Sequence, residues 1–440
     1  MRKQRHFLIQ FICVLVVLTA IMTQGFTRVV KMNPLFGYPK EEKAQPLQFK
    51  TFYDGSYQDY LTEHAKRNTG FREFWIRLYN QYLYNCFHKI SNNNIQEGED
   101  KELFLNMYLN EITGQTLLNK FGSVEEAKSQ ARLHAQETLT LIDTLRQHGT
   151  YFLYVFAPTK TALYPEKMPK YYREHIADFC LEEYYIELFK EYHIPHIDLY
   201  HYFQSVKDTS AYPLYTKAAS HWSEYVIPMA ADTILKTLRA LTGYDLPTIQ
   251  LIDENVTSNY SDYDWELEKS MNLLFPWPKP ARPRPLYTLS DTVGKDRPNL
   301  LVIGDSYFDQ LMFSCFKDAF NQWDFWQYMM NVYSSKGYWN VPFNDIKGTS
   351  KTLRNADIVL GINTAPMLYN FMSGFPVKAP DMYRPQDDEI QEMMEIIRKN
   401  PKWYQAVVDQ AEAKKLPVED NLRINAIYFL EHQKKRNFAP

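Results

Sequence analysis

One segment, an apolar run that ends in a polar turn and is followed by helical spacing, constrains the fold most strongly. Residues 300–303 are Leu-Leu-Val-Ile, and Gly304, Asp305 and Ser306 follow directly. Residues 308–320 then place Leu311, Cys315 and Ala319 on one stripe, with Met312, Phe316 and Phe320 beside it. A polar turn between a buried strand and a helix lies at the carboxyl edge of an open α/β sheet, where such folds place their sites.

The preceding part of the chain repeats this alternation of helices and strands. Ser123 and Glu126 form a capping-box signature for a helix that runs to His148, where Gly149 supplies a stop. Residues 151–158 read as a buried strand, 179–192 as a helix and 194–199 as the next strand. The pattern predicts an α/β fold with a three-layer α/β/α parallel sheet over residues 116–380.

Two separated residues suggest nucleophilic chemistry. Ser306 occupies the polar turn, although Gly-Asp-Ser alone is equally typical of an ordinary helix-capping turn. His221, followed by Trp222, precedes a predicted helix with the stripe Val226, Ala230, Ile234 and Leu238. A serine hydroxyl needs a neighbouring base to attack an ester, and histidine is the usual one. A single histidine among eleven is otherwise more typical of packing or the surface.

These motifs, in this order, resemble a known group. The chain is similar over roughly residues 50–375 to the SGNH-hydrolase-like proteins of bacterial exopolysaccharide O-acetylation, the AlgJ- and AlgX-like alginate acetylation group. The matching stretches are the His-Trp pair before the Gly-Asp-Ser serine (a circularly permuted order), Gly-Phe-Arg-Glu-Phe at 70–74 with Asn-Gln at 80–81, and Val-Phe-Ala-Pro-Thr-Lys at 155–160 leading into Tyr-Pro-Glu at 164–166. The resemblance implies serine-dependent O-acetyl transfer to an exported or cell-surface polysaccharide. It also implies a membrane-bound O-acyltransferase partner that supplies the acyl group.

The sequence departs from that group at the third catalytic position. The group carries Asp two residues before the histidine, and here that residue is Ala219. Asp262 and Asp264 are the nearest substitutes in sequence, although each is also typical of a solvated loop acid. In the wider superfamily an Asn supplies an oxyanion donor, and Asn363, after the apolar run 358–362, is the candidate here. A turn-favouring Asn after a core strand is the plainer interpretation of that residue.

Three functions therefore stay open: an O-acetyltransferase, an acetyl esterase that uses water as acceptor, and a non-catalytic polysaccharide-binding or scaffold protein of the export machinery. Ala219 favours the last.

The chain has 33 Tyr, 27 Phe and 8 Trp, and those exposed would suit the C–H faces of sugar rings. A net charge of −3 gives no reason to expect nucleic acid. No cofactor motif or metal-ligand spacing is found, and of the four cysteines only Cys86 and Cys180 are candidates for a pair.

The ends of the chain predict a membrane anchor and a helical appendage. Residues 1–6 are basic and residues 7–26 carry no charge, which predicts a signal anchor over 1–27, with a cleaved signal peptide as the alternative. In a two-membrane bacterium the anchor would lie in the inner membrane and the main domain in the periplasm. Residues 28–115 form an arm, and 381–440 a small helical appendage.

Residues 275–285, rich in proline, should be an extended loop near Ser306, either lining a polymer groove or acting as a stiff connector.

Overall fold

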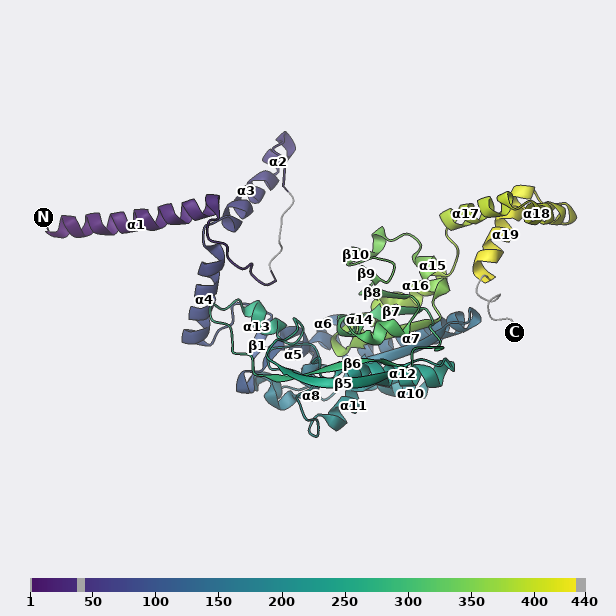
Figure 1. Cartoon of the computed structure of the whole chain (residues 1–440), viewed down its shortest axis with the longest axis horizontal. Helices are drawn as coiled ribbons and strands as arrows, with labels where there is room; N and C mark the ends of the chain where they lie inside the picture. Colours follow the sequence, from purple (N-terminus) through teal and green to yellow (C-terminus); the bar gives the residue numbers. More distant parts are fainter. Residues whose placement is uncertain (1, 38–43, 433–440) are drawn as a thin grey trace. The chain divides into compact units, whose positions relative to one another are not determined.

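The computed structural model describes residues 2–37 and 44–432, which form two compact units (Figure 1). The first comprises residues 1–97 with 265–279, and the second residues 98–264 with 280–440. Each unit is made of segments that are distant in the sequence. The second unit contains the sheet and both Ser306 and His221.

The first unit begins with the apolar helix expected from the sequence. Helix α1 (Arg2–Thr27) contains a stretch, residues 5–27, that is long and apolar enough to cross a membrane, with a mean hydropathy of 2.3. Gly70 lies against the end of this helix, where a Cβ would come within 2.0 Å of Ile21 O. Only glycine permits so close a backbone approach, which explains the glycine that opens the 70–74 motif. The other helices of this unit are α2 (Phe49–Tyr53), α3 (Ser56–Arg67), α4 (Arg72–Phe87) and α13 (Glu266–Met271).

The second unit is built on a seven-stranded sheet of order β10-β9-β8-β7-β11-β3-β4. The five strands from β8 to β4 are parallel, whereas β9 and β10 run antiparallel at one edge. Their bounds are β3 (Tyr151–Ala157), β4 (His196–Asp198), β7 (Leu300–Gly304), β8 (Trp323–Gln327), β9 (Asn331–Ser334), β10 (Val341–Pro342) and β11 (Ile358–Thr364). The predicted three-layer α/β/α sheet is confirmed, with an antiparallel edge that the sequence pattern did not indicate.

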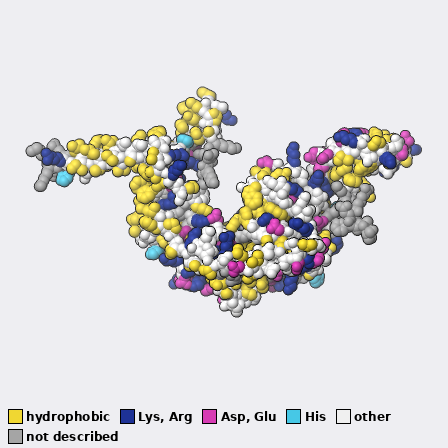
Figure 2. All heavy atoms as spheres, in the orientation of Figure 1, with side chains coloured by type: hydrophobic (Ala, Val, Ile, Leu, Met, Phe, Trp, Pro, Cys, Tyr) yellow, Lys and Arg dark blue, Asp and Glu magenta, His cyan; other side chains and the backbone are white. Residues whose placement is uncertain are grey.

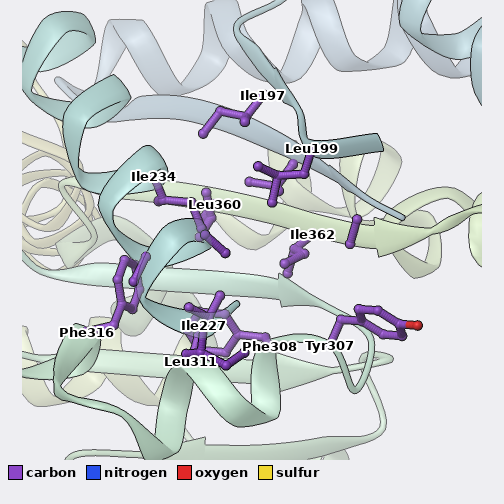
Figure 3. Packing of buried hydrophobic residues seen from close by; sticks show 14 of the residues in the cluster. Ile197, Leu199, Ile227, Ile234, Tyr307, Phe308, Leu311, Phe316, Leu360 and Ile362 are labelled. Atoms are coloured by element: carbon purple, nitrogen blue, oxygen red, sulfur yellow. The ribbon is translucent and has the colours of Figure 1, made fainter. Parts of the chain in front are cut away.

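Helices cover both faces of the sheet because the central strands alternate buried side chains between two cores. Leu360 and Ile362 of β11 face one core, which contains residues of α11 (Leu199–Val206), α12 (Ile227–Thr242) and α14 (Phe308–Phe313). Figure 3 shows Ile227, Ile234, Phe308 and Leu311 gathered around these two strand residues. The other core takes Val359 together with residues of α7 (Val124–Gln147), α10 (Leu181–Glu191), α15 (Thr349–Asn355) and α16 (Phe375–Met382). The short helices α5 (Asn106–Ile112), α6 (Gln115–Phe121), α8 (Lys160–Leu163) and α9 (Lys170–Arg173) complete this part of the unit.

The helix predicted over 308–320 is shorter than expected. Helix α14 ends at Phe313, Ser314 adopts an extended ψ of 179°, and a 3-10 turn, η3, follows over Cys315–Ala319. Ser314 Oγ accepts a hydrogen bond of 3.1 Å from the N–H of Phe316 and so starts the new turn. A serine that can cap from outside the helix competes with helix continuation, and the apolar spacing alone does not reveal this.

The proline-rich segment is extended as expected, but part of it is a strand rather than a loop. Strand β6 (Arg282–Ser290) pairs antiparallel with β5 (Thr248–Thr257) in a separate two-stranded sheet. Proline cannot donate to a ladder, but each strand of a two-stranded sheet has one unpaired edge, so the segment is tolerated there.

The C-terminal helices form their own small core. Helices α17 (Asp387–Lys399), α18 (Pro401–Lys414) and α19 (Val418–His432) bury Ile390, Met394, Ile397, Val407, Leu422 and Ala426 together. They form the helical appendage expected over residues 381–440, of which residues 433–440 lie outside the described part of the chain. Arg354 of α15 and Glu389 of α17 form an ion pair of 2.7 Å.

A partly buried histidine in α7 generates a prediction about acid stability. His134 contacts the hydroxyl of Tyr185 at 2.6 Å and stacks on Phe371, and burial lowers its pKa to about 4. Between the ordinary histidine value of 6.5 and about 4, the unfolded chain binds a proton that the folded chain does not, so the free energy of unfolding falls as the pH falls through this window. We expect His134→Gln to remove up to roughly 3 kcal/mol of this pH dependence. Urea unfolding at several pH values measures it, with the exposed His175→Gln as matched control. An unchanged slope in His134→Gln would contradict the assignment.

Candidate functional site

Ser306 lies at the junction between a central strand and a helix. Strand β7 ends at Gly304 and α14 begins at Phe308. A Cβ on Gly304 would approach Ile362 O to 2.3 Å, so glycine is needed where β7 passes closest to β11. The buried carboxylate of Asp305 accepts hydrogen bonds from Thr364 N at 2.7 Å and from Tyr307 N at 3.0 Å. Gly304 and Asp305 therefore shape and fix the turn that presents Ser306.

His221 reaches this turn from a loop that precedes α12 by several residues. Its Nε2 lies 2.9 Å from Ser306 Oγ, although the two residues are 85 positions apart in the sequence. This is a hydrogen-bonding distance between a serine hydroxyl and a potential base. The structure therefore brings together the serine and the histidine selected from the sequence.

Tyr307 ties the histidine loop to the serine turn. Its hydroxyl donates a 2.8 Å hydrogen bond to the carbonyl of Ser220, the residue before His221. The same hydroxyl lies 3.2 Å from that of Tyr215, which donates to Pro158 O. The ring of Trp222 packs on the Tyr307 ring at 5.2 Å. The residues adjacent to Ser306 and His221 are thus bonded to each other, which fixes the spacing of the pair.

A buried lysine holds the chain that leads to His221. Lys160 is 1% exposed and pairs with Glu102 at 2.8 Å. Its ammonium also donates to the carbonyls of Thr216 at 2.8 Å and Lys217 at 3.0 Å. A buried cation is tolerated only when it is paired and hydrogen-bonded, and here the Glu102 carboxylate and these backbone carbonyls meet that need. This gives a structural role to the last residue of the 155–160 motif.

The two acids weighed as triad substitutes lie in one loop but in different environments. Asp264 is fully buried, forms an ion pair with Arg282 and accepts from Glu224 N at 3.2 Å. Asp262 is exposed. Between them, the ring of Tyr263 packs edge-on against the His221 ring at 5.3 Å, so this loop lies beside the histidine. Ala219 is fully buried.

Tyr263 is itself held by an acid of α14. Its hydroxyl donates to Asp309 Oδ2 at 3.1 Å, and Asp309 Oδ1 accepts from Gln327 Nε2 at 3.0 Å. Burial raises the pKa of Asp309 to about 6. Neither Tyr263 nor Asp309 was selected from the sequence, because no local pattern shows that their side chains meet beside His221.

The two arginines of the proline-rich segment are paired with acids. Arg282 binds Asp264, and Arg284 Nε lies 3.0 Å from the carboxylate of Glu224, three residues after His221. These ion pairs dock the two-stranded sheet on the histidine loop.

The two oxyanion candidates differ in their contacts with Ser306. Asn363 is buried, and its Oδ1 accepts a 3.3 Å hydrogen bond from Tyr154, whose ring lies in the core that contains α7 and α10. A donor that the sequence did not indicate, the Tyr328 hydroxyl, lies 3.4 Å from Ser306 Oγ and accepts from Ser306 N at 3.3 Å. Burial raises the pKa of Tyr328 to about 12, so the phenol stays protonated. Tyr328 follows the end of β8, and no motif distinguishes it among 33 tyrosines.

Within the part of the chain that the structure describes, no cluster of three or more His, Cys, Asp or Glu side chains could hold a metal ion. Cys13, Cys86, Cys180 and Cys315 are free thiols.

Comparison with known proteins identifies one family and several solved structures that are similar to this chain. Residues 96–313, just under half of the chain, match the family described as the SGNH hydrolase-like domain of acetyltransferase AlgX. Among solved structures, the chain is similar to the O-acetyltransferase domain of Pseudomonas putida AlgJ (14% identity, TM-score 0.41, covering 66% of this chain and 99% of that one) and to Pseudomonas aeruginosa AlgX (15%, 0.40, 65% and 67%). It is also similar to Bacillus cereus PatB1 (13%, 0.34, 56% and 92%).

A search of curated proteins finds no match. The family match begins just before the second unit and ends with α14, so it contains both His221 and Ser306. This segment of the chain belongs to the SGNH hydrolase-like domain family of acetyltransferase AlgX.

Proposed function

We propose that Ser306 accepts an acyl group, most simply acetyl, and passes it to a hydroxyl of an exported or cell-surface polysaccharide. The observation that carries the proposal is the 2.9 Å contact between His221 Nε2 and Ser306 Oγ at a strand-to-helix junction. The AlgX-type family of this segment supports acetyl as the group transferred.

In the first half-reaction His221 takes the proton from Ser306 Oγ, and the oxygen attacks the carbonyl carbon of the acyl donor. The tetrahedral oxyanion is stabilised by the N–H of Ser306 and the hydroxyl of Tyr328, which already meet at Ser306. When the intermediate collapses, His221 returns the proton to the leaving group. The acyl group remains as an ester on Ser306.

The second half-reaction repeats these steps with a sugar hydroxyl. His221 removes its proton, the alkoxide oxygen attacks the Ser306 ester, and collapse returns the proton to Ser306 Oγ. The products are the O-acylated sugar and the free enzyme. With water as acceptor the same steps would release acetate, which is the esterase alternative.

The imidazolium formed in each half-reaction needs a stabilising neighbour, and Ala219 cannot provide one. We propose Asp262 rather than Asp264 for this role. Asp264 is already committed to Arg282, whereas Asp262 directly precedes Tyr263, whose ring lies against His221.

The apolar helix α1 supports an inner-membrane anchor with the catalytic unit in the periplasm. Acetyl-CoA is a cytoplasmic donor, so the acyl group must be carried across the membrane. We propose a membrane-bound O-acyltransferase as the partner that delivers it to Ser306.

The second candidate is a non-catalytic polysaccharide-binding protein, and the buried Ala219 at the usual acid position favours it. In that case the site would have lost its triad acid and would bind polysaccharide without catalysing a reaction. Covalent reactivity of Ser306 separates the two.

We expect an arylsulfonyl fluoride to label Ser306 in the full-length protein in detergent. Because the nucleophile depends on its base, Ser306→Ala and His221→Ala should lose both the label and the hydrolysis of p-nitrophenyl acetate by roughly 10³-fold or more. Peptide mass spectrometry locates the adduct, and the exposed Ser205→Ala is the matched control. Labelling elsewhere, or full turnover in Ser306→Ala, would exclude the proposed nucleophile.

The two loop acids should separate catalysis from stability. We expect Asp262→Asn to lower kcat by about 10² or more with an unchanged melting temperature, because the side chain is exposed. Asp264→Asn should leave Arg282 without its buried partner and cost about 3–5 kcal/mol of folding free energy. Ester-hydrolysis kinetics and thermal melts of both variants measure this. A wild-type kcat in Asp262→Asn would remove it from the mechanism.

Tyr328→Phe tests the oxyanion donor. Removing the hydroxyl while keeping the ring should lower kcat by about 10² and change KM little, since the contact strengthens only when charge develops. Sulfonylation of Ser306 should persist, which separates this role from loss of the nucleophile. If kcat is unchanged, Tyr328 only packs against the serine.

A further inference from the structure

A continuous series of aromatic rings leads from His221 to the surface of the second unit. The Tyr263 ring lies 5.3 Å from His221 and 6.2 Å from Phe313. Phe313 lies 5.6 Å from Trp339. Phe313 and Trp339 are 53% and 56% exposed, although large aromatic side chains are usually covered. Figure 2 shows hydrophobic side chains at the surface where Figure 1 places β9 and β10, the hairpin that carries Trp339. We call Tyr263, Phe313 and Trp339 the aromatic strip.

The outer end of the strip is fixed to the core. Trp339 packs edge-on against Tyr333 at 5.4 Å, and Tyr333 stacks at 5.9 Å on Phe325, which is fully buried in β8. Within the hairpin, the Tyr333 hydroxyl donates to Asn340 Oδ1 at 3.0 Å and Ser334 N donates to Tyr338 O at 2.9 Å. The exposed Trp339 is therefore held in place rather than free to fold back.

Polar groups border the strip along its length. At the inner end Asp309 and Gln327 hold the Tyr263 hydroxyl, and at the outer end Asn340 and Lys336 flank Trp339 in the hairpin turn. Each of these groups also has a partner within the protein, and the exposed Asn340 and Lys336 make the border of the strip polar. Sugar rings present C–H faces to aromatic rings and hydroxyls to polar neighbours, so they match both components.

We propose that the aromatic strip is the acceptor subsite, which binds consecutive hexopyranose residues of the polysaccharide by stacking. This rests on the proposed function, because it takes Ser306 and His221 as the reacting end. The sugar that receives the acyl group would lie beside Tyr263, and the polymer would continue over Phe313 to Trp339. The occupant is thus a glycan of several residues rather than a single sugar.

Glycan binding to the full-length protein in detergent tests the subsite without requiring turnover. The probes are β-1,4-linked hexamers of glucose, N-acetylglucosamine and mannuronate, with dissociation constants measured by calorimetry. For the hexamer that binds the wild type most tightly, we expect Trp339→Ala and Phe313→Ala to weaken binding about tenfold, as for other central aromatic contacts. Trp339→Phe should restore most of the affinity, because a ring remains. Tyr171→Ala, which removes an exposed aromatic outside the strip, is the matched control.

Sulfonylation of Ser306 in the wild type reports on the proposed function separately. If labelling fails while Trp339→Ala still weakens binding, the catalytic proposal falls and the strip remains a glycan-binding surface. If labelling succeeds but Trp339→Ala binds the hexamers as tightly as the wild type, the strip is not the subsite. The proposal is equally overturned if none of the three hexamers binds the wild type, or if Tyr171→Ala weakens binding as much as Trp339→Ala does.

Discussion

The hydrogen bond from the Tyr307 hydroxyl to the Ser220 carbonyl is the contact on which the proposed site depends. It joins the residue after Ser306 to the residue before His221, so it sets the separation of the pair through the backbone of both loops. A bond between buried, rigidly packed groups loses little conformational entropy when substrate arrives. The phenol is buried with Tyr215 and Trp222, which keeps water from competing for the carbonyl.

Buried charged groups fix the segments next to these two loops. Lys160 binds the carbonyls of the segment before His221, and the Asp264–Arg282 pair secures the loop that carries Tyr263. Charges in such positions cost desolvation energy and add little net stability, whereas removal of either partner is severe. Their value here is that they fix loops, which apolar packing alone specifies poorly.

The sequence indicated the parts of the fold that depend on local pattern. Apolar runs and capping signals located β3, β7, β11, α7 and the C-terminal helices, and Gly-Asp-Ser located the strand-to-helix turn. The break at Ser314 was not foreseen, because a single side-chain cap overrides the apolar spacing. Tyr263 and Tyr328 were not foreseen either, since each reaches the site only through the packing of a distant segment, and nothing in a single sequence marks which tyrosines will meet there. The departure at Ala219 was visible in the sequence, but the different environments of Asp262 and Asp264 depend on spatial position rather than on spacing.

In the proposed mechanism, the contact between Tyr328 and Ser306 also determines how strongly the bound ester and the tetrahedral intermediate are each stabilised. The N–H of Ser306 already donates to the Tyr328 oxygen, so an incoming ester carbonyl exchanges one neutral acceptor for another and gains little. A tetrahedral oxyanion also replaces the Tyr328 oxygen as the acceptor of this N–H, but it carries a negative charge. Charge-assisted hydrogen bonds are roughly twice as strong as neutral ones. Because the Ser306 N–H already has an acceptor before substrate binds, it stabilises the bound ester little. It stabilises the intermediate strongly once the carbonyl oxygen becomes negative.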